Sequence, residues 1–253
     1  MRVRPRDYLG DQTPEERAEV NRRTAADWIY RFGFSGAQVL KHVLQKQGAG
    51  WPSVAAKRGL LRSTKTESGV PGVFYTLAEP GLQLAERHSM TLLPYPEIDP
   101  FRVNQATMRH NLLVQMLTVK AINSGQIVGV TTEKELNAGD QRGQKRPDAI
   151  WHFADGQRIG IEMELSAKWD RKLDEFIAGI AASLDSEVPE DRLDGFAIIT
   201  DSEAICRRYR QSMKPGEPLK YWRKNARHQW EVESIEKVPA WLQDHVEVRM
   251  VAM

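Results

Sequence analysis

The chain has 253 residues, which is long for one domain and comfortable for two. Its formal net charge is +2, and no apolar run approaches the roughly 20 residues that a membrane-spanning helix needs. The single Cys206 excludes internal disulfide bonds and a zinc site built from several thiolates, and the N-terminus lacks the apolar segment of a signal peptide. We therefore expect a cytoplasmic protein with no membrane segment.

The positive charge is unevenly distributed along the chain. Residues 1–90 contain 14 Lys and Arg against 9 Asp and Glu, and no acidic residue occurs between Asp27 and Glu67. A second basic stretch runs from Cys206 to Gln229, where Glu217 is the single acidic residue. Two basic stretches in a nearly neutral protein indicate two places that could contact a phosphate backbone, although solvated surface charge looks similar.

Residues 1–90 divide into short elements separated by turn signals. Thr13–Glu16 has the pattern of a capping box with Pro14 at the first helical position, which predicts a helix to about Phe32. The elements expected after it are a short helix from Ser35, a third helix over Ser53–Gly59, strands Leu60–Thr64 and Val73–Leu77, and a helical turn to His88. Three helices, a hairpin and a further helix is the order of a winged helix-turn-helix domain.

In a winged helix-turn-helix domain the third helix enters a DNA groove and the hairpin flanks the backbone. The basic residues on these two elements are Lys57, Arg58, Arg62 and Lys65. We therefore expect residues 1–90 to bind double-stranded DNA. A winged helix that contacts protein is the alternative.

Residues 91–101 contain three prolines and predict an extended linker, which leaves residues 102–253 for a second domain with helices and strands. The elements expected there are helix Arg102–Ser124, strand Ile127–Leu136, a polar loop over 137–145, strands Asp148–Phe153 and Arg158–Leu165, helix Trp169–Leu184, buried strand Gly195–Thr200, basic helix Ser202–Gln211 and terminal strands Gln229–Ser234 and Glu247–Val251. The whole chain is thus expected to be an α/β (α+β) protein.

Acidic residues gather on the two central strands of this second domain. Apolar residues alternate through Ile159–Leu165, so Glu162 and Glu164 share one face of the strand. Asp148 opens the neighbouring strand, and Lys168 follows just past the second. Carboxylate oxygens suit Mg²⁺ or Mn²⁺, and a nearby lysine can orient or deprotonate water, so these residues could hydrolyse a phosphodiester. A half-exposed strand beside a surface lysine has the same pattern.

Pro147-Asp148, Glu162-x-Glu164 and Lys168 resemble the PD-(D/E)xK nuclease motif, except that Glu164 stands where the motif has its lysine. The resemblance implies a restriction-endonuclease-like domain in which Asp148 and Glu162 bind the metal. Glu164 would be a ligand or base, and Lys168 would polarise water or stabilise charge developing on the phosphate.

Glu133 lies on the strand expected before this pair, and Glu135 lies two residues further on the same face. Either would complete the metal shell or orient a metal-bound water, and the sequence leaves the choice between them open.

A winged helix followed by an acidic α/β domain resembles the replication-relaxation family, which includes the plasmid-encoded mobilisation relaxases of the MOB-C type. The segments that carry this resemblance are Val73–Leu82, Arg109–Leu112, Glu133–Leu136, Arg146–Asp148 and Glu162–Glu164. It implies a protein that nicks plasmid DNA at a transfer origin by metal-dependent hydrolysis. Relaxosome or coupling proteins would then be further partners.

The second basic stretch is expected to guide a DNA strand, including single-stranded DNA, to the acidic site. Its first basic residues are Arg207, Arg208 and Arg210. We expect Tyr209 and Tyr221 to pack or to stack on bases, and Trp222 of the same stretch to stack as well. A covalent mechanism through one of these tyrosines is an alternative. The other two are a non-catalytic DNA-binding regulator or relaxosome accessory with an inactive nuclease fold, and a restriction-type endonuclease that breaks both strands.

Overall fold

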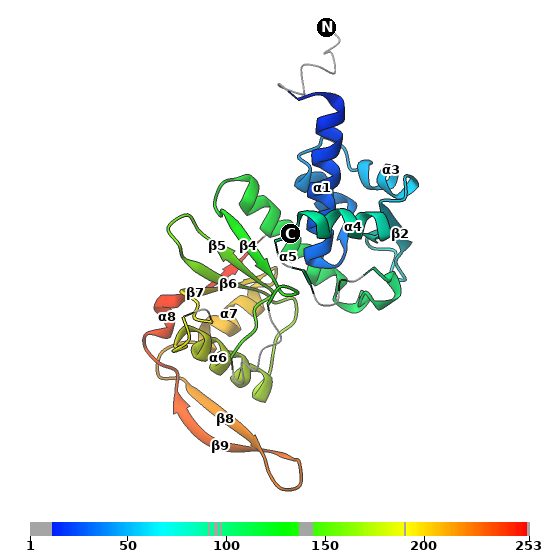
Figure 1. Cartoon of the computed structure of the whole chain (residues 1–253). Helices are drawn as coiled ribbons and strands as arrows, with labels where there is room; N and C mark the ends of the chain where they lie inside the picture. The colour runs from blue at the N-terminus through cyan, green and yellow to red at the C-terminus, as the bar shows by residue number, and fades with distance from the viewer. Residues whose placement is uncertain are drawn as a thin grey trace. The chain divides into compact units, whose positions relative to one another are not determined.

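The computed structural model describes residues 12–90, 92, 93, 96, 98–136, 144–189 and 191–251. The chain is a mixed α/β protein whose contacts divide it into two compact units, Met1–Lys120 and Ala121–Met253 (Figure 1). Pro94 of the expected linker and residues 137–143 of the expected loop lie outside the described residues. None of the described helices combines the length and apolar character that crossing a membrane requires.

The first unit builds a small sheet surrounded by helices. Its elements are α1 (Pro14–Phe32), β1 (Ser35–Gly36), α2 (Ala37–Val43), α3 (Trp51–Lys57), β2 (Leu61–Lys65), β3 (Val73–Leu77), α4 (Glu79–His88), the 3₁₀ turns η2 (Pro100–Arg102) and η3 (Gln105–Thr107), and α5 (Met108–Asn123). The strands form an antiparallel sheet in the order β1-β3-β2. The capping box at Thr13 is confirmed, because Thr13 Oγ1 accepts from Glu16 N and Glu16 Oε2 accepts from Thr13 N.

Helix α5 belongs mainly to the first unit, although the sequence assigned it to the second domain. The buried side chain of Gln115 accepts hydrogen bonds from Trp28 Nε1 at 3.0 Å and Ser35 Oγ at 2.8 Å, and its Nε2 donates to Phe34 O at 3.0 Å. Val119 joins the apolar core of the same unit. A fully satisfied buried network of this kind holds the helix in one place. The division between the units therefore falls inside α5, beyond the expected linker 91–101.

Gly81, in the first turn of α4, allows this helix to approach the backbone just before β2 closely. A Cβ at this position would lie 2.3 Å from Leu60 O, a backbone atom that cannot move aside as a side chain can. We expect Gly81→Ala to destabilise the first unit by about 3 kcal/mol, the upper end of the usual cost of overpacking. Urea unfolding checks this.

The matched control for that substitution is Gly48→Ala, because a Cβ on Gly48 would meet nothing within 4 Å. We expect it to change stability by no more than about 0.5 kcal/mol. Similar unfolding curves for the two variants would contradict the close approach at Gly81.

The second unit is a five-stranded sheet in the order β10-β7-β6-β5-β4. Strands β4, β5 and β6 pair antiparallel, whereas β6, β7 and β10 run parallel. The elements in chain order are β4 (Gly129–Thr132), β5 (Ala149–His152), β6 (Arg158–Met163), α6 (Asp170–Leu184), β7 (Gly195–Thr200), α7 (Glu203–Ser212), β8 (Pro218–Lys224), β9 (Trp230–Lys237), α8 (Leu242–His245) and β10 (Val246–Met250).

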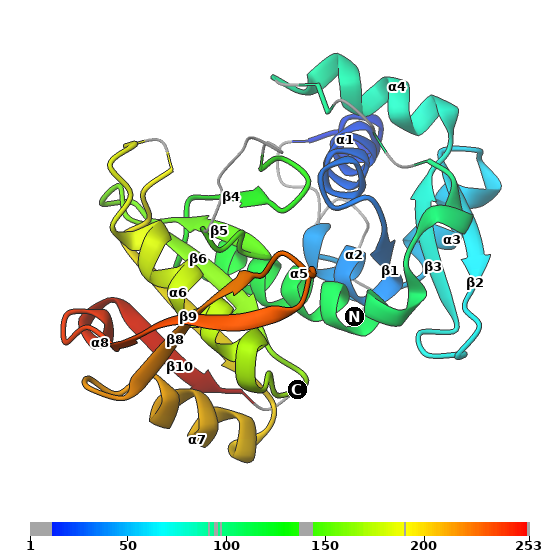
Figure 2. The same ribbon diagram turned by 90° about the horizontal axis from the view of Figure 1, so that it is seen from below.

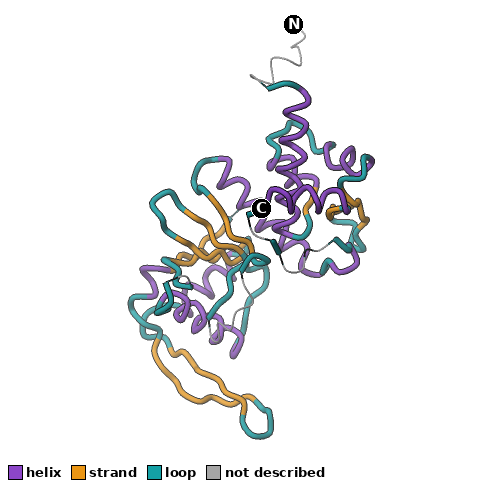
Figure 3. Tube along the Cα trace, in the orientation of Figure 1, coloured by secondary structure: helices purple, strands orange, loops and turns teal. Residues whose placement is uncertain are grey.

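Helices α6 and α7 pack on one face of this sheet (Figure 2). The core between them contains Phe176 and Tyr209 from the helices and Ile150, Ile198 and Val248 from the strands. Strands β8 and β9 form a separate two-stranded hairpin that projects from the sheet (Figure 3). Strand β8 was not predicted, because its five basic and aromatic residues were interpreted only as part of a basic stretch: Lys220, Tyr221, Trp222, Arg223 and Lys224.

Candidate functional site

Asp148 and Glu162 lie opposite each other at the end of the central strand pair. The register of β5 and β6 places Ala149 opposite Ile161, so the residues one step further along are Asp148 and Glu162. Asp148 N donates to Ile161 O at 3.0 Å, and Met163 N donates to Asp148 Oδ2 at 2.8 Å. The carboxylate of Asp148 is therefore fixed against the β6 backbone between Glu162 and Glu164.

Each glutamate is buried and faces a lysine. Glu162 and Glu164 expose only 3% and 4% of their surface, so they do not form the solvated strand face that the alternation also permitted. Lys145 Nζ lies 2.6 Å from Glu162 Oε1, and Lys168 Nζ forms an ion pair with Glu164 Oε1. Since buried charges are stable only when paired, the two lysines explain how two glutamates can occupy this core.

Lys145 is the site residue that the sequence did not reveal. It lies in a polar stretch with no regular pattern. In the sequence, its position three residues before Asp148 is the one indication of a role at the site. The structure anchors it on α6, where its backbone N donates to Gly179 O at 2.9 Å and to Ser183 Oγ at 3.0 Å. The loop that leads into β5 thus carries a lysine to the neighbouring strand β6.

Two aromatic rings close the site on the helix side. Lys168 Nζ lies 4.5 Å and Lys145 Nζ 5.7 Å from the centre of the Phe176 ring, and Tyr209 meets that ring edge-on at 5.5 Å. Tyr209 is completely buried. Burial, with the negative charge of Glu164, raises the pKa of the Tyr209 hydroxyl above its ordinary value. A ring enclosed in this way is not available to stack on a base.

The negative charge of the cluster is only partly compensated. Burial is the main cause that raises the pKa of Glu162 to about 8, and the neighbouring charge of Asp148 raises it further. The ammonium of Lys145 lowers this pKa, and Glu164 adds a smaller upward effect. A cation placed near Asp148 and Glu162 would therefore offset the repulsion between these two carboxylates.

Asp148 and Glu162 offer the type of oxygen ligand that Mg²⁺ prefers. Among the described residues, no group of three or more His, Cys, Asp and Glu side chains is arranged to hold a metal ion. Mg²⁺, however, is commonly bound by one or two carboxylates, with waters and substrate phosphates completing the shell. Asp148 and Glu162 match this mode, which needs no preformed protein cage.

Glu133 and Glu135 do not lie on a strand face as the sequence predicted. Strand β4 ends at Thr132, and a turn follows because Thr132 N donates to Glu135 Oε2 at 2.8 Å. Glu133 is exposed in this turn, and its backbone oxygen accepts from Arg146 Nη2. The strand placement was wrong, and a role of Glu133 at the metal stays a prediction.

The predicted DNA-binding residues fall into two groups. The side chains on the α3 end and β2 are exposed and make no ion pair within the described part of the chain: Lys57, Arg58, Arg62 and Lys65. On α7, in contrast, Arg208 Nε donates to Lys168 O at 2.9 Å, and Arg210 Nη2 donates to Val248 O at 2.8 Å. Arg207 projects outward, 3.7 Å from Glu203. Two of these three arginines thus also hold the fold.

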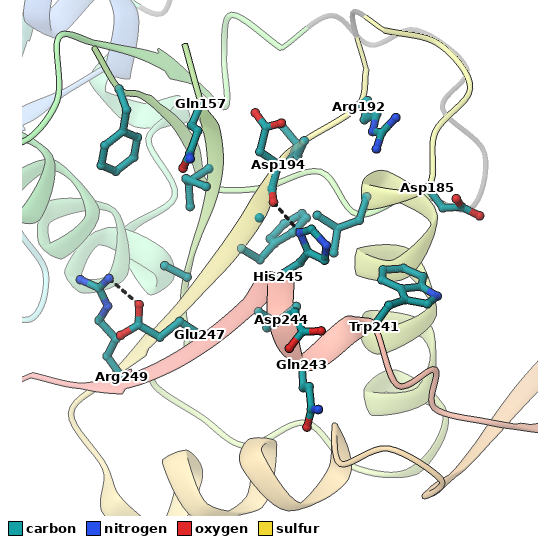
Figure 4. Close-up of a pocket in the computed structure, with 18 residues that line it drawn as sticks. Gln157, Asp185, Arg192, Asp194, Trp241, Gln243, Asp244, His245, Glu247 and Arg249 are labelled. Carbon is teal, nitrogen blue, oxygen red and sulfur yellow. Dashed lines mark hydrogen bonds and ion pairs between the residues drawn. The ribbon is translucent and has the colours of Figure 1, made fainter. Parts of the chain in front are cut away.

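A cavity of about 910 Å³ lies at the opposite end of the parallel strands, where β6, β7 and β10 begin (Figure 4). Among the side chains around it are Asp194, Trp241 and His245, and His245 Nδ1 lies 3.0 Å from Asp194 O. In open sheets of this kind, ligands usually bind beyond the carboxyl ends of the parallel strands, which is where Glu162 and Glu164 lie. We therefore place the candidate site at the carboxylates rather than in this cavity.

Comparisons with protein-family models, curated proteins and solved structures found no match. The resemblance to the replication-relaxation family therefore stays an expectation carried by short motifs.

Proposed function

We propose that this protein is a DNA-binding, metal-dependent endonuclease whose site contains Asp148, Glu162, Glu164 and Lys168. The observation that carries the proposal is the placement of Asp148 opposite Glu162 on paired strands, where burial and then the charge of Asp148 raise the pKa of Glu162. This arrangement supports a PD-(D/E)xK-like domain, with the lysine displaced to the segment after β6.

Asp148 and Glu162 would hold Mg²⁺ or Mn²⁺, which when bound would neutralise phosphate charge and make a water more acidic. Lys168 is held by Glu164, so its ammonium group has a fixed position near the carboxylates. There it would stabilise negative charge that develops on the phosphate. Lys145 would keep the metal-free carboxylates partly neutralised until the substrate and metal arrive.

The first unit supports the DNA-binding part of the proposal. Its order α1, β1, α2, α3, β2, β3 around a small antiparallel sheet is consistent with a winged helix-turn-helix domain. In such a domain, α3 would enter the groove and the β2–β3 hairpin would flank the backbone. The exposed basic side chains on α3 and β2 have the charge needed for phosphate contact.

Reversing two charges at the end of α3 is expected to weaken duplex binding strongly. Lys57 and Arg58 are exposed, so Lys57→Glu with Arg58→Glu should leave the fold intact while removing two phosphate contacts and adding repulsion. We expect at least a tenfold loss of affinity at moderate salt and a flatter salt dependence, by about one unit of log–log slope per lost contact. A gel-shift series across salt concentrations measures both.

The control carries the same charge change elsewhere in the first unit. Arg87→Glu with Lys120→Glu alters two exposed basic residues on α4 and α5. If both double variants lose affinity equally, the effect is one of net charge, and α3 is not the recognition helix.

Incubation with a supercoiled plasmid and Mg²⁺ or Mn²⁺ tests the proposed reaction. Open circles would support a nickase, and linear products would support a restriction-type enzyme that cuts both strands. The narrower assignment, nicking at a plasmid transfer origin together with relaxosome or coupling proteins, rests on the family resemblance alone. Preferred cutting of a plasmid with a transfer origin would support it.

A non-catalytic DNA-binding protein is the second candidate. One observation favours it: both buried glutamates already form ion pairs with lysines. Retarded but intact plasmid over a range of metal concentrations would support it and would reject the endonuclease.

A further inference from the structure

Trp169 is an exposed aromatic residue immediately beside the candidate site. It directly precedes α6 and exposes 61% of its surface. The guanidinium of Arg208, from α7, lies 3.5 Å from the centre of its ring, which is stacking distance. One face of the indole is thus covered by a cation, and the large exposed fraction leaves most of the remaining ring open to solvent.

The position of this ring is fixed relative to the site. Arg208 Nε donates to Lys168 O at 2.9 Å, and Lys168 Nζ pairs with Glu164. Trp169 follows Lys168 in the chain, so their Cα atoms are about 3.8 Å apart. Asp170, the next residue, has φ of +44°, a conformation that non-glycine residues seldom adopt. Such a backbone is usually kept where the neighbouring side chains must be held in one arrangement.

Trp230 repeats the arrangement on the hairpin. It begins β9, exposes 43% of its surface, and lies 4.1 Å from the guanidinium of Arg171 and 5.2 Å from Lys224 Nζ, measured to the ring centre. Arg171 is two residues after Trp169, so the Cα atoms of these two residues lie within about 7 Å. Two partly exposed indole rings, each in contact with a guanidinium group, therefore lie near the start of α6.

We propose that Trp169 and Trp230 stack the unpaired bases of single-stranded DNA and lead that strand to the Asp148–Glu162 site. The inference rests on the proposed function and adds the substrate class: a strand with splayed bases rather than an intact duplex. An indole can stack on any base, whereas a duplex hides the base faces. The arginines and Lys224 add positive charge for the phosphates that connect those bases.

This assignment replaces the stacking role expected of the second basic stretch. Tyr209 is buried, Tyr221 is packed against the core, and Trp222 Nε1 donates to Asp174 Oδ2 at 2.9 Å. No local pattern singles out Trp169, because the arginine that covers it lies 39 residues away on another helix.

Binding of a fluorescently labelled oligo-dT, measured by anisotropy in the presence of EDTA, tests the proposal. We expect Trp169→Ala to lower the affinity roughly tenfold to a hundredfold, Trp230→Ala to lower it less, and Trp169→Phe to retain most of it. The affinity for a duplex of the same length should change much less, because duplex binding is assigned to the first unit.

Trp241→Ala is the matched control. Trp241 is 39% exposed, but its ring packs edge-on against His245 at the other end of the strands. Thermal unfolding of every variant establishes that each is folded. Unchanged oligo-dT affinity in folded Trp169→Ala, or an equal loss in Trp241→Ala, or an equal loss for duplex, would each overturn the proposal.

The two proposals fail in different ways. EDTA prevents metal-dependent cleavage, so the binding experiment does not depend on catalysis. A plasmid that stays intact while Trp169→Ala loses oligo-dT binding would reject the endonuclease and keep the base-stacking surface. Plasmid cleavage by the unaltered protein, together with unchanged oligo-dT binding by the tryptophan variants, would keep the endonuclease and reject the base-stacking surface.

Discussion

Asp148→Asn and Glu162→Gln are each expected to abolish plasmid cleavage while leaving DNA binding intact. Both substitutions keep the size of the side chain and remove the charge that would hold the metal. Changing a residue that only supports a metal ligand typically costs 10- to 100-fold, so loss of a ligand should reduce the rate by at least about a hundredfold. Cleavage of supercoiled plasmid in Mg²⁺ and Mn²⁺, together with a gel shift on the same samples, measures the two effects separately.

Glu187→Gln provides the control, because Glu187 is an exposed carboxylate in the loop after α6 of the same unit. It should cleave like the unaltered protein. Glu133→Gln tests whether that exposed turn residue contributes to the metal shell. A partial loss of the cleavage rate would support the assignment of Glu133 to the shell, and full activity would rule it out. Normal nicking by Asp148→Asn or Glu162→Gln would refute the assignment of the metal ligands.

The metal-free protein is expected to become less stable as the pH rises, and Glu162 is the reason. Folding raises the pKa of this carboxyl from its ordinary value of 4.5 to about 8, chiefly by burial. The folded state therefore binds a proton that the unfolded chain has already released. The extra proton stabilises the folded state. Its contribution to the free energy of unfolding is fully present below about pH 4.5 and is lost as the pH rises through about 8. Each unit of pKa difference corresponds to about 1.4 kcal/mol.

Urea unfolding in EDTA, at pH values from below 4.5 to above 8, measures this effect. In Glu162→Gln the decline should be much smaller, because the amide does not ionise, whereas Glu187→Gln should follow the unaltered protein. Parallel pH profiles for Glu162→Gln and the unaltered protein would contradict the raised pKa.

Metal binding should also be coupled to the protonation of Glu162. A carboxylate must lose its proton to bind Mg²⁺ or Mn²⁺, so binding near neutral pH should release a proton from Glu162. Calorimetry in two buffers with different ionisation enthalpies would detect that proton, and Glu162→Gln should remove it.

Local patterns predicted α1 and the β2–β3 hairpin of the first unit, because capping and turn signals are short-range, but they missed β1. The capping box at Thr13 begins α1 as expected, and the strands of the hairpin appear within one residue of their predicted bounds. Strand β4 was predicted too long, because the side chain of Glu135 closes a turn that propensity alone does not reveal.

The candidate site could be predicted only in part. Alternation predicted that Glu162, on β6, and Glu164, just after it, share a face, but a period of two does not say which face is buried. The partners of these carboxylates come from distant segments: Lys145 is brought by a loop anchored on α6, and Tyr209 by α7. Such contacts depend on the packing of helices against the sheet, which one sequence does not encode in any local pattern.

The attachment of α5 has a practical consequence for separating the two halves of the protein. A fragment that stops at residue 90 would lack Gln115, so Trp28 Nε1 and Ser35 Oγ would lose their shared acceptor and a buried apolar surface would be uncovered. A fragment that starts at residue 102 would carry α5 without the side chains that receive it. A fragment that contains the first unit should therefore extend through Asn123, and the complementary fragment should begin after it.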